Sequence, residues 1–153
     1  MMKQIKQRIK AHEGFRDTIY KDSLGKATIG WGHLILETDN FEENVQYSVE
    51  ELESTFEHDF KIALDGANTL IQAHLGSNEY NDLSKQNKHI IKGIITEMVF
   101  QLGTTGVSKF KQMWFNLDLC NFARASQEML DSKWYQQTKE RCIELSCIIR
   151  NIK

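Results

Sequence analysis

Strand-forming residues are concentrated in one short segment of this chain, Phe15 to Leu34, and helical periodicity dominates elsewhere. The segment is rich in β-branched and aromatic residues, and the run Asp22 to Lys26 has the composition of a turn. Gly30 and Gly32, on either side of Trp31, indicate a bend or a close backbone approach. We therefore expect a small antiparallel sheet near the N-terminus.

The residues around this segment predict helices. Ile5 and Ile9 lie four residues apart among polar residues, which is typical of a short amphipathic helix ending near residues 12–14. Ser48, followed three residues later by Glu51, forms a capping box that predicts a long helix from about residue 49 to beyond residue 64. Residues 76–83 are expected to form a loop.

The second half of the chain predicts a helical core. Residues 87–102 carry apolar side chains on more than one face, which is typical of a central, buried helix. Gly103 and Gly106 would end this helix and open the next element, and several short helices should follow. The expected fold class is α+β in one domain over residues 1–153. It has a small sheet lobe at about 13–48 and a larger helical lobe at about 49–153, which includes the N-terminal helix.

Composition excludes several classes of protein. The net charge of -2 gives no global attraction to nucleic acid or to anionic lipid. No apolar stretch is long enough to span a membrane, and the basic N-terminus lacks the features of a secretory signal. Three cysteines without paired metal spacing predict free, mostly buried thiols, at positions 120, 142 and 147. The five histidines form no zinc pattern, so we expect no metal and no cofactor.

Two carboxylates and a hydroxyl form the candidate chemistry. Glu13 is expected at the end of the first helix, Asp22 at the turn and Thr28 in a strand. Glycosidic hydrolysis needs one carboxylic acid to protonate the leaving oxygen, and a second carboxylate to activate water or attack the sugar. This spacing uses common residue types, and taken alone it favours solvated surface acids over catalytic residues.

The surrounding residues resemble the catalytic segment of phage-type lysozymes, glycoside hydrolase family 24, whose best-known members are the endolysins of T-even phages. The segment comprises His12–Arg16, Ile19–Asp22, Gly25 and Thr28–Leu34. Three further segments match in order: Glu50–Asp59; Met98–Gly103 with Thr105–Val107; and Ser132–Tyr135 with Gln137, Thr138 and Arg141. The resemblance covers most of the chain and implies a lysozyme-like fold.

The resemblance also implies residue roles. Glu13 matches the family's general acid, while Asp22 and Thr28 match the groups that act with the attacking water in an inverting reaction. The remaining matched residues are supporting or substrate-cleft positions. Leu34 and Phe100 match substrate-cleft positions, Arg141 matches an arginine that pairs with the catalytic glutamate, and His33 and Asp59 match a structural ion pair.

This chain departs from the T-even members in several places. The segment between Leu34 and Ser48 is shorter, and the segment from Asp65 to Gln86 is longer. Met113 and Glu128 stand where those members have a serine and an asparagine in contact with substrate, and Glu97 replaces an asparagine. These differences concern substrate contacts rather than the three candidate catalytic residues.

The expected function is hydrolysis of the β-1,4 bond between N-acetylmuramic acid and N-acetylglucosamine in bacterial peptidoglycan. We expect a monomer made in the host cytoplasm that reaches the wall, in the periplasm, after holin-assisted release. One alternative is a catalytically silent peptidoglycan-binding protein on the same scaffold. Another is a lysozyme domain used as an antibacterial toxin or carried on a virion.

Overall fold

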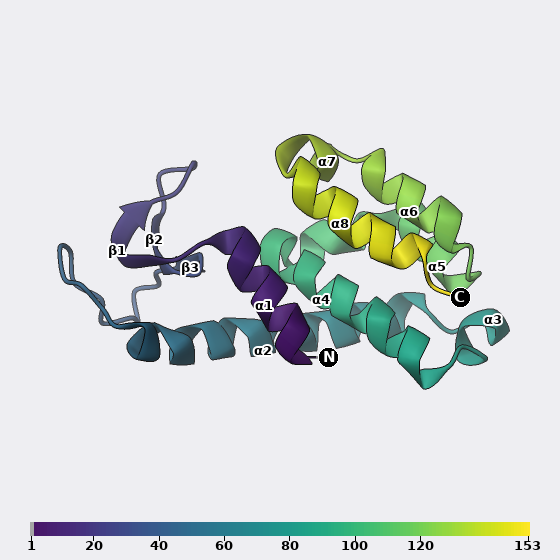
Figure 1. The fold of residues 1–153 in the computed structure, drawn as a ribbon, viewed down its shortest axis with the longest axis horizontal. Coiled ribbons are helices and arrows are strands. Elements are labelled where there is room, and N and C mark those ends of the chain that lie inside the picture. The colour runs from purple at the N-terminus through teal and green to yellow at the C-terminus, as the bar shows by residue number, and fades with distance from the viewer. Residues whose placement is uncertain (1) are drawn as a thin grey trace. The chain divides into compact units, whose positions relative to one another are not determined.

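The structure, a computed structural model, describes residues 2–153 (Figure 1). The chain divides into two compact units, Met1–Ile62 and Ala63–Lys153. Helix α2, Val49–His74, contributes its first part to one unit and its second part to the other.

The first unit contains a helix, a small sheet and the beginning of α2. Helix α1 spans Met2–Glu13, and the strands are β1 (Arg16–Lys21), β2 (Ala27–Gly30) and β3 (His33–Leu34). The three strands are antiparallel in the order β1-β2-β3, as Figure 1 shows. The α+β class expected from the sequence is confirmed.

Aromatic rings connect α1, the sheet and α2 within this unit. The ring centroid of Trp31 lies 4.7 Å from that of Phe15 and 5.6 Å from that of Phe56. The Lys10 ammonium lies 4.1 Å from the Trp31 centroid and bonds to the Glu53 carboxylate at 2.6 Å. Trp31 is therefore part of a cation–π cluster that holds α1 against α2.

The capping box at the start of α2 forms as expected. The Ser48 backbone N–H donates to Glu51 Oε2 at 2.7 Å, and the Glu51 N–H donates to Ser48 Oγ at 3.2 Å. Two N–H groups that the helix leaves without intrahelical partners are satisfied in this way. The helix begins at Val49, the residue at which the sequence placed it.

The second unit contains the end of α2 and six further helices. They are α3 (Asn78–Asn81), α4 (Lys85–Ser108), α5 (Lys111–Asp118), α6 (Phe122–Leu130), α7 (Lys133–Gln137) and α8 (Lys139–Arg150). Ile91, Ile95 and Met98 of α4 are fully buried, so α4 is the central helix that the apolar pattern predicted. Helices α6 and α8 pack side by side in this unit (Figure 1).

Gly103 interrupts α4, and Gly106 does not. Gly103 has φ 73° and ψ 163°, which is a non-helical conformation that glycine adopts without the steric cost of a side chain. The chain then resumes a helical path through Gly106 to Ser108. The expected break is therefore at Gly103 alone.

The prediction of a plain loop over residues 76–83 is wrong, because this stretch contains α3. Ser77 Oγ accepts from the Tyr80 N–H at 3.0 Å, and the Tyr80 side chain is buried. The Asp118 carboxylate accepts from the N–H groups of Gly76 and Ser77. A serine cap, an aromatic anchor and a partner 41 residues away in sequence thus order the segment.

The prediction of mostly buried thiols is also wrong. The three cysteines are free, but only Cys142 is buried, while Cys120 is partly exposed and Cys147 is exposed. Burial raises the pKa of the Cys142 thiol to about 11. Within residues 2–153, none of the helices combines the length and apolar content that a membrane span requires.

Candidate active site

Glu13 ends α1, and Gly32 makes room for its carboxylate. A Cβ atom at position 32 would lie 2.9 Å from Glu13 Oε2, a contact that real side chains do not make. Gly32 also has φ 80°, in the left-handed region that favours glycine. The glycine after Trp31 therefore allows the backbone to approach the candidate acid, as the sequence pattern suggested for this bend.

Asp22 lies in the turn between β1 and β2, where backbone amides hold its side chain. Its Oδ1 accepts from the N–H of Leu24 at 2.8 Å and from the N–H of Lys26 at 2.9 Å. Both bonds end on the same carboxylate oxygen. Two donors from one turn fix the orientation of the carboxylate, which is what a base for a bound water requires.

Thr28 lies in the middle of a row that crosses the three strands. It is paired with Tyr20 on β1 and with Leu34 on β3, and residues directly opposite each other share one face of a sheet. The Thr28 hydroxyl donates to the Lys26 carbonyl at 3.0 Å, which leaves its lone pairs as acceptors. The side chain is 4% exposed.

Tyr20 lies opposite Thr28, and both candidate carboxylates affect its phenol. Burial raises the pKa of its phenol, the Glu13 carboxylate raises it further, the Arg16 guanidinium lowers it, and the Asp22 carboxylate raises it. Both carboxylates are therefore close enough to act on one phenol, and the same tyrosine lies opposite Thr28. Glu13 and Asp22 thus affect the phenol electrostatically, and Thr28 is its cross-strand neighbour.

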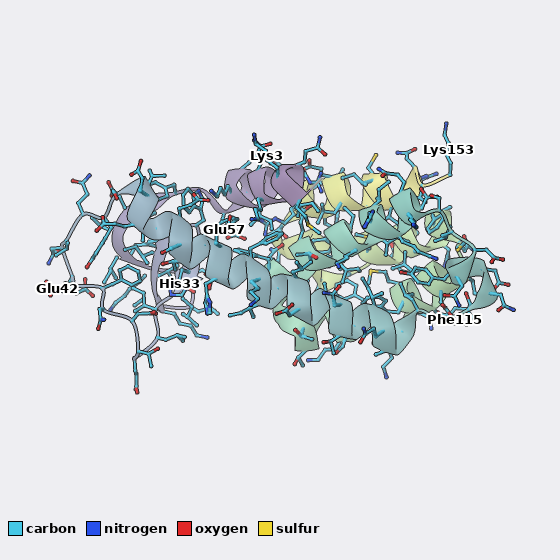
Figure 2. All side chains as sticks on the ribbon, turned by 90° about the horizontal axis from the view of Figure 1, so that it is seen from below. Lys3, His33, Glu42, Glu57, Phe115 and Lys153 are labelled. Atoms are coloured by element: carbon cyan, nitrogen blue, oxygen red, sulfur yellow. The ribbon has the colours of Figure 1, made fainter. Side chains whose placement is uncertain are left out.

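His33 is held by two carboxylates rather than one. Its Nδ1 lies 2.8 Å from Asp59 Oδ2 on α2, as expected, and its Nε2 lies 3.0 Å from Asp39 Oδ2. Figure 2 shows His33 beside the first part of α2. The hydrogen bond to Asp59 raises the pKa of His33, burial opposes it, and Asp39 raises it further. The cluster fastens β3 and the following turn to α2.

Asp39 is a residue that the sequence reasoning missed. Its carboxylate accepts from the Leu36 N–H at 2.7 Å, and this bond holds the pKa of the Asp39 carboxyl below its usual value. Burial opposes that effect, and His33 adds to it. The available signal was an aspartate three residues after a leucine in a polar segment, which is a common turn composition.

The other expected site residues are distributed over both units. Leu34 is on β3 and 44% exposed. Phe100 is on α4 in the second unit and packs in part against its core. Arg141 is on α8 in the same unit and is 6% exposed.

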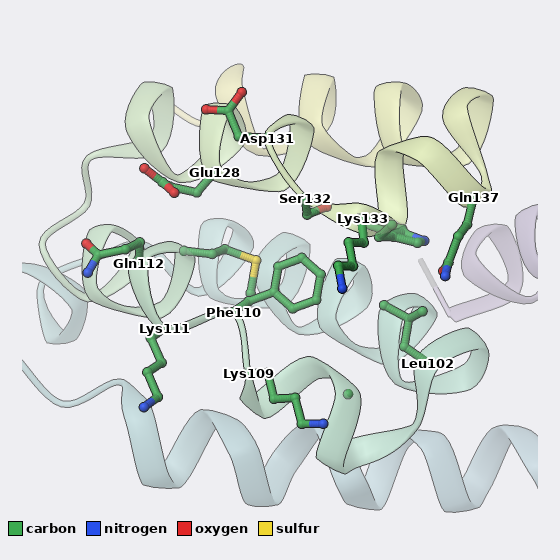
Figure 3. Close-up of a pocket in the computed structure, with 13 residues that line it drawn as sticks. Leu102, Lys109, Phe110, Lys111, Gln112, Glu128, Asp131, Ser132, Lys133 and Gln137 are labelled. Atoms are coloured by element: carbon green, nitrogen blue, oxygen red, sulfur yellow. The ribbon is translucent and has the colours of Figure 1, made fainter.

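A pocket of about 610 Å³ lies within the second unit (Figure 3). Its wall has an apolar part, formed by Phe110 and Met113, and a charged part. The charged part combines three lysines with two acidic residues: Lys109, Lys111, Lys133, Glu128 and Asp131. Met113 and Glu128 are the two residues that stand at family substrate-contact positions, so both departures occur in the lining of one cavity. Among residues 2–153, no group of three His, Cys, Asp or Glu side chains is arranged to hold a metal ion.

Comparison with known proteins identifies the family. Residues 10–86 match the family described as phage lysozyme. The chain is 31% identical to "Probable T4-type lysozyme 2" of Dictyostelium discoideum, over 92% of this chain and 90% of that protein. "Probable T4-type lysozyme 1" of the same organism is 29% identical, over 97% of this chain and 95% of that protein.

A third relative is a much longer protein. The "Pre-baseplate central spike protein" of Enterobacteria phage T4 is 29% identical over 92% of this chain, which corresponds to 26% of the spike protein. These matches agree with the resemblance carried by the N-terminal segment. The chain belongs to the phage lysozyme family, and it is therefore a glycoside hydrolase of the lysozyme type.

Proposed function

We propose that this lysozyme cleaves the β-1,4 bond between N-acetylmuramic acid and N-acetylglucosamine in peptidoglycan, with Glu13 as general acid and Asp22 as general base. Thr28 accepts a hydrogen bond from the attacking water and orients it. The observation that carries the proposal is the arrangement around Tyr20: both carboxylates act on its phenol, and Thr28 lies opposite it.

Each residue suits its part of the reaction. Glu13 gives a proton to the glycosidic oxygen as the bond to the anomeric carbon breaks. Asp22 takes a proton from water with a carboxylate that two backbone amides orient. Water attacks the anomeric carbon from the face opposite the leaving group, so the configuration inverts, and the two carboxyl groups need to lie about 6.5–9.5 Å apart to admit that water.

Leu34 and the pocket of the second unit are proposed substrate contacts. Leu34 is in the same cross-strand row as Thr28, and its exposure leaves an apolar surface for a sugar ring. Met113 and Glu128 line the pocket, where they replace polar neutral residues of the T-even members. Phe100 remains a proposed cleft residue and Arg141 a proposed partner of Glu13, both on the family match.

Clearing of a peptidoglycan suspension by the wild type and by Glu13→Gln tests the proposal. The wild type should clear the suspension, and Glu13→Gln should lose nearly all activity, since the amide cannot donate a proton. Glu43→Gln removes an exposed carboxylate of the same unit and should leave the rate unchanged. A folded Glu13→Gln that clears walls at the wild-type rate contradicts the proposal.

Two further measurements test its finer parts. Proton NMR of the first product should show the α anomer at the N-acetylmuramic acid end, and a first-formed β anomer would exclude inversion. A wild type that binds peptidoglycan without clearing it would support the silent-scaffold alternative.

We also propose that the protein acts as a monomer, and that it reaches the periplasm from the host cytoplasm with the help of a holin. The support is that its substrate class lies in the wall. Expression with and without a holin should give lysis only with the holin. Lysis without any holin would exclude this route.

A further inference from the structure

The row of side chains that crosses the sheet contains a residue to which the reaction above gives no part. Leu34, Thr28 and Tyr20 are paired in register across β3, β2 and β1, so all three lie on one face of the sheet. Leu34 and Thr28 have proposed roles at the substrate, and Tyr20 occupies the third position of the same row. Because Tyr20 is paired with Thr28, a substrate group or water that contacts Thr28 would also lie near Tyr20.

Arg16 holds the ring of Tyr20. The guanidinium carbon lies 4.9 Å from the ring centroid, within the range of a cation–π contact. Such a contact restricts the ring, so the phenol has less conformational freedom to lose when it binds a ligand. Tyr20 is thus partly buried and preorganised by a residue of its own strand.

The phenol of Tyr20 is partly buried in a polar environment. The charges of two carboxylates, those of Glu13 and Asp22, act on this phenol. Burial raises the pKa of this phenol, and so do the Glu13 and Asp22 carboxylates, while the Arg16 guanidinium lowers it. The phenol is therefore neutral at neutral pH. A neutral phenol offers one donor and also acceptor lone pairs.

We propose that the Tyr20 hydroxyl binds a polar oxygen of the substrate sugar between Glu13 and Asp22 and so positions the glycan for cleavage. This inference rests on the proposed function, because it assigns the ligand of Tyr20 from the reaction of those two carboxylates. A sugar hydroxyl or acetamide oxygen fits the site, since it can pair with a neutral phenol and carries no charge to be repelled by the carboxylates. Arg16 acts through the ring and is a positioning residue.

Binding measured without hydrolysis tests this role. The probe is a soluble peptidoglycan tetrasaccharide of alternating N-acetylglucosamine and N-acetylmuramic acid, titrated into Glu13→Gln by calorimetry. Adding Tyr20→Phe to this variant keeps the ring and removes only the hydroxyl. We expect its Kd to rise about five- to tenfold, the range for one lost hydrogen bond to a ligand.

Tyr47→Phe is the matched control in the same unit. The Tyr47 hydroxyl accepts from the Glu42 N–H at 2.8 Å, so its removal tests the loss of a structural hydroxyl away from the row. In the same Glu13→Gln background this control should leave Kd unchanged. With Glu13 restored, Tyr20→Phe should raise KM in clearing assays, and Tyr47→Phe should not.

The outcomes separate this inference from the proposed function. If Glu13→Gln is inactive and Tyr20→Phe binds the tetrasaccharide as well as its parent, the role of Tyr20 is refuted and the catalytic proposal stands. If Glu13→Gln remains active, the catalytic proposal fails first. Should Tyr20→Phe not fold, ring-labelled tyrosine in Glu13→Gln gives the answer: the Tyr20 signals must shift on adding tetrasaccharide, and unmoved signals refute the inference.

Discussion

Replacing Asp59 with asparagine should destabilise the protein at pH 5.5 and should do so much less at pH 9. The Nδ1–Oδ2 distance between His33 and Asp59 is 2.8 Å, and the His33 side chain is only 9% exposed. A hydrogen bond that involves a charged group contributes about 1.5–3 kcal/mol, and burial keeps screening by solvent weak, so we expect a loss of about 2 kcal/mol at pH 5.5.

The pH dependence follows from the direction of each shift. The pKa of His33 is raised in the folded protein, so its stabilisation is complete below about pH 6.5 and is lost as the pH rises through the folded value. The pKa of Asp39 is lowered, so its stabilisation is present above about pH 3.9 and is lost as the pH falls through its folded value. The cluster should therefore stabilise most between about pH 4.5 and 6.5.

Urea unfolding at the two pH values, with NMR titration of the His33 ring, measures both quantities. Asp59→Asn should lower the pKa of His33 more than Asp39→Asn, because the bond to Asp59 is the largest cause of the shift. The stability difference between the two pH values should match the change in pKa at about 1.4 kcal/mol per unit. Asp17→Asn, which neutralises the carboxylate that accepts from Gln46 in the same unit, is the control. Equal losses for Asp59→Asn at pH 5.5 and pH 9 would refute the reasoning.

Two further predictions concern the candidate site. Gly32→Ala should lower the lytic rate roughly tenfold or more, because the added methyl group displaces the Glu13 carboxylate. Gly30→Ala is the control: its φ is similar, but its added methyl group would make only ordinary contacts with Leu52, so it should retain most activity. Equal lytic rates for the two variants at equal stability would contradict this prediction. EDTA should leave wall clearing unchanged, because carboxylates and a hydroxyl perform the proposed chemistry. Loss of clearing that a divalent metal restores would contradict metal independence.

Structural features that depend on neighbouring residues could be predicted from the sequence. The capping box needs only Ser48 and Glu51, whose mutual hydrogen bonds form within one helical turn. The interruption of α4 needs only the backbone freedom of Gly103. Such features depend on residues a few positions apart, so their spacing alone identifies them.

Structural features that depend on a residue far away in the sequence could not be predicted. Helix α3 depends on Asp118, which accepts from the N–H groups that precede the helix, and no periodicity within residues 76–83 reveals that partner. Asp39 likewise bonds to His33 only because the turn after β3 folds back on that strand. Tyr20 was counted as a strand residue, and its place in the site follows from strand register rather than from residue type.

The spacing of the candidate residues is itself a consequence of that register. The turn closes with a hydrogen bond from the Asp22 N–H to the Lys26 carbonyl, and the strands then pair Lys21 with Ala27 and Tyr20 with Thr28. Five residues between Asp22 and Thr28 are therefore what this turn needs to bring the threonine opposite Tyr20. One residue more or fewer in the turn would shift the register and move Thr28 to the other face of the sheet. A spacing of common residue types is weak evidence by itself, but it gains physical meaning once the hairpin that enforces it is known.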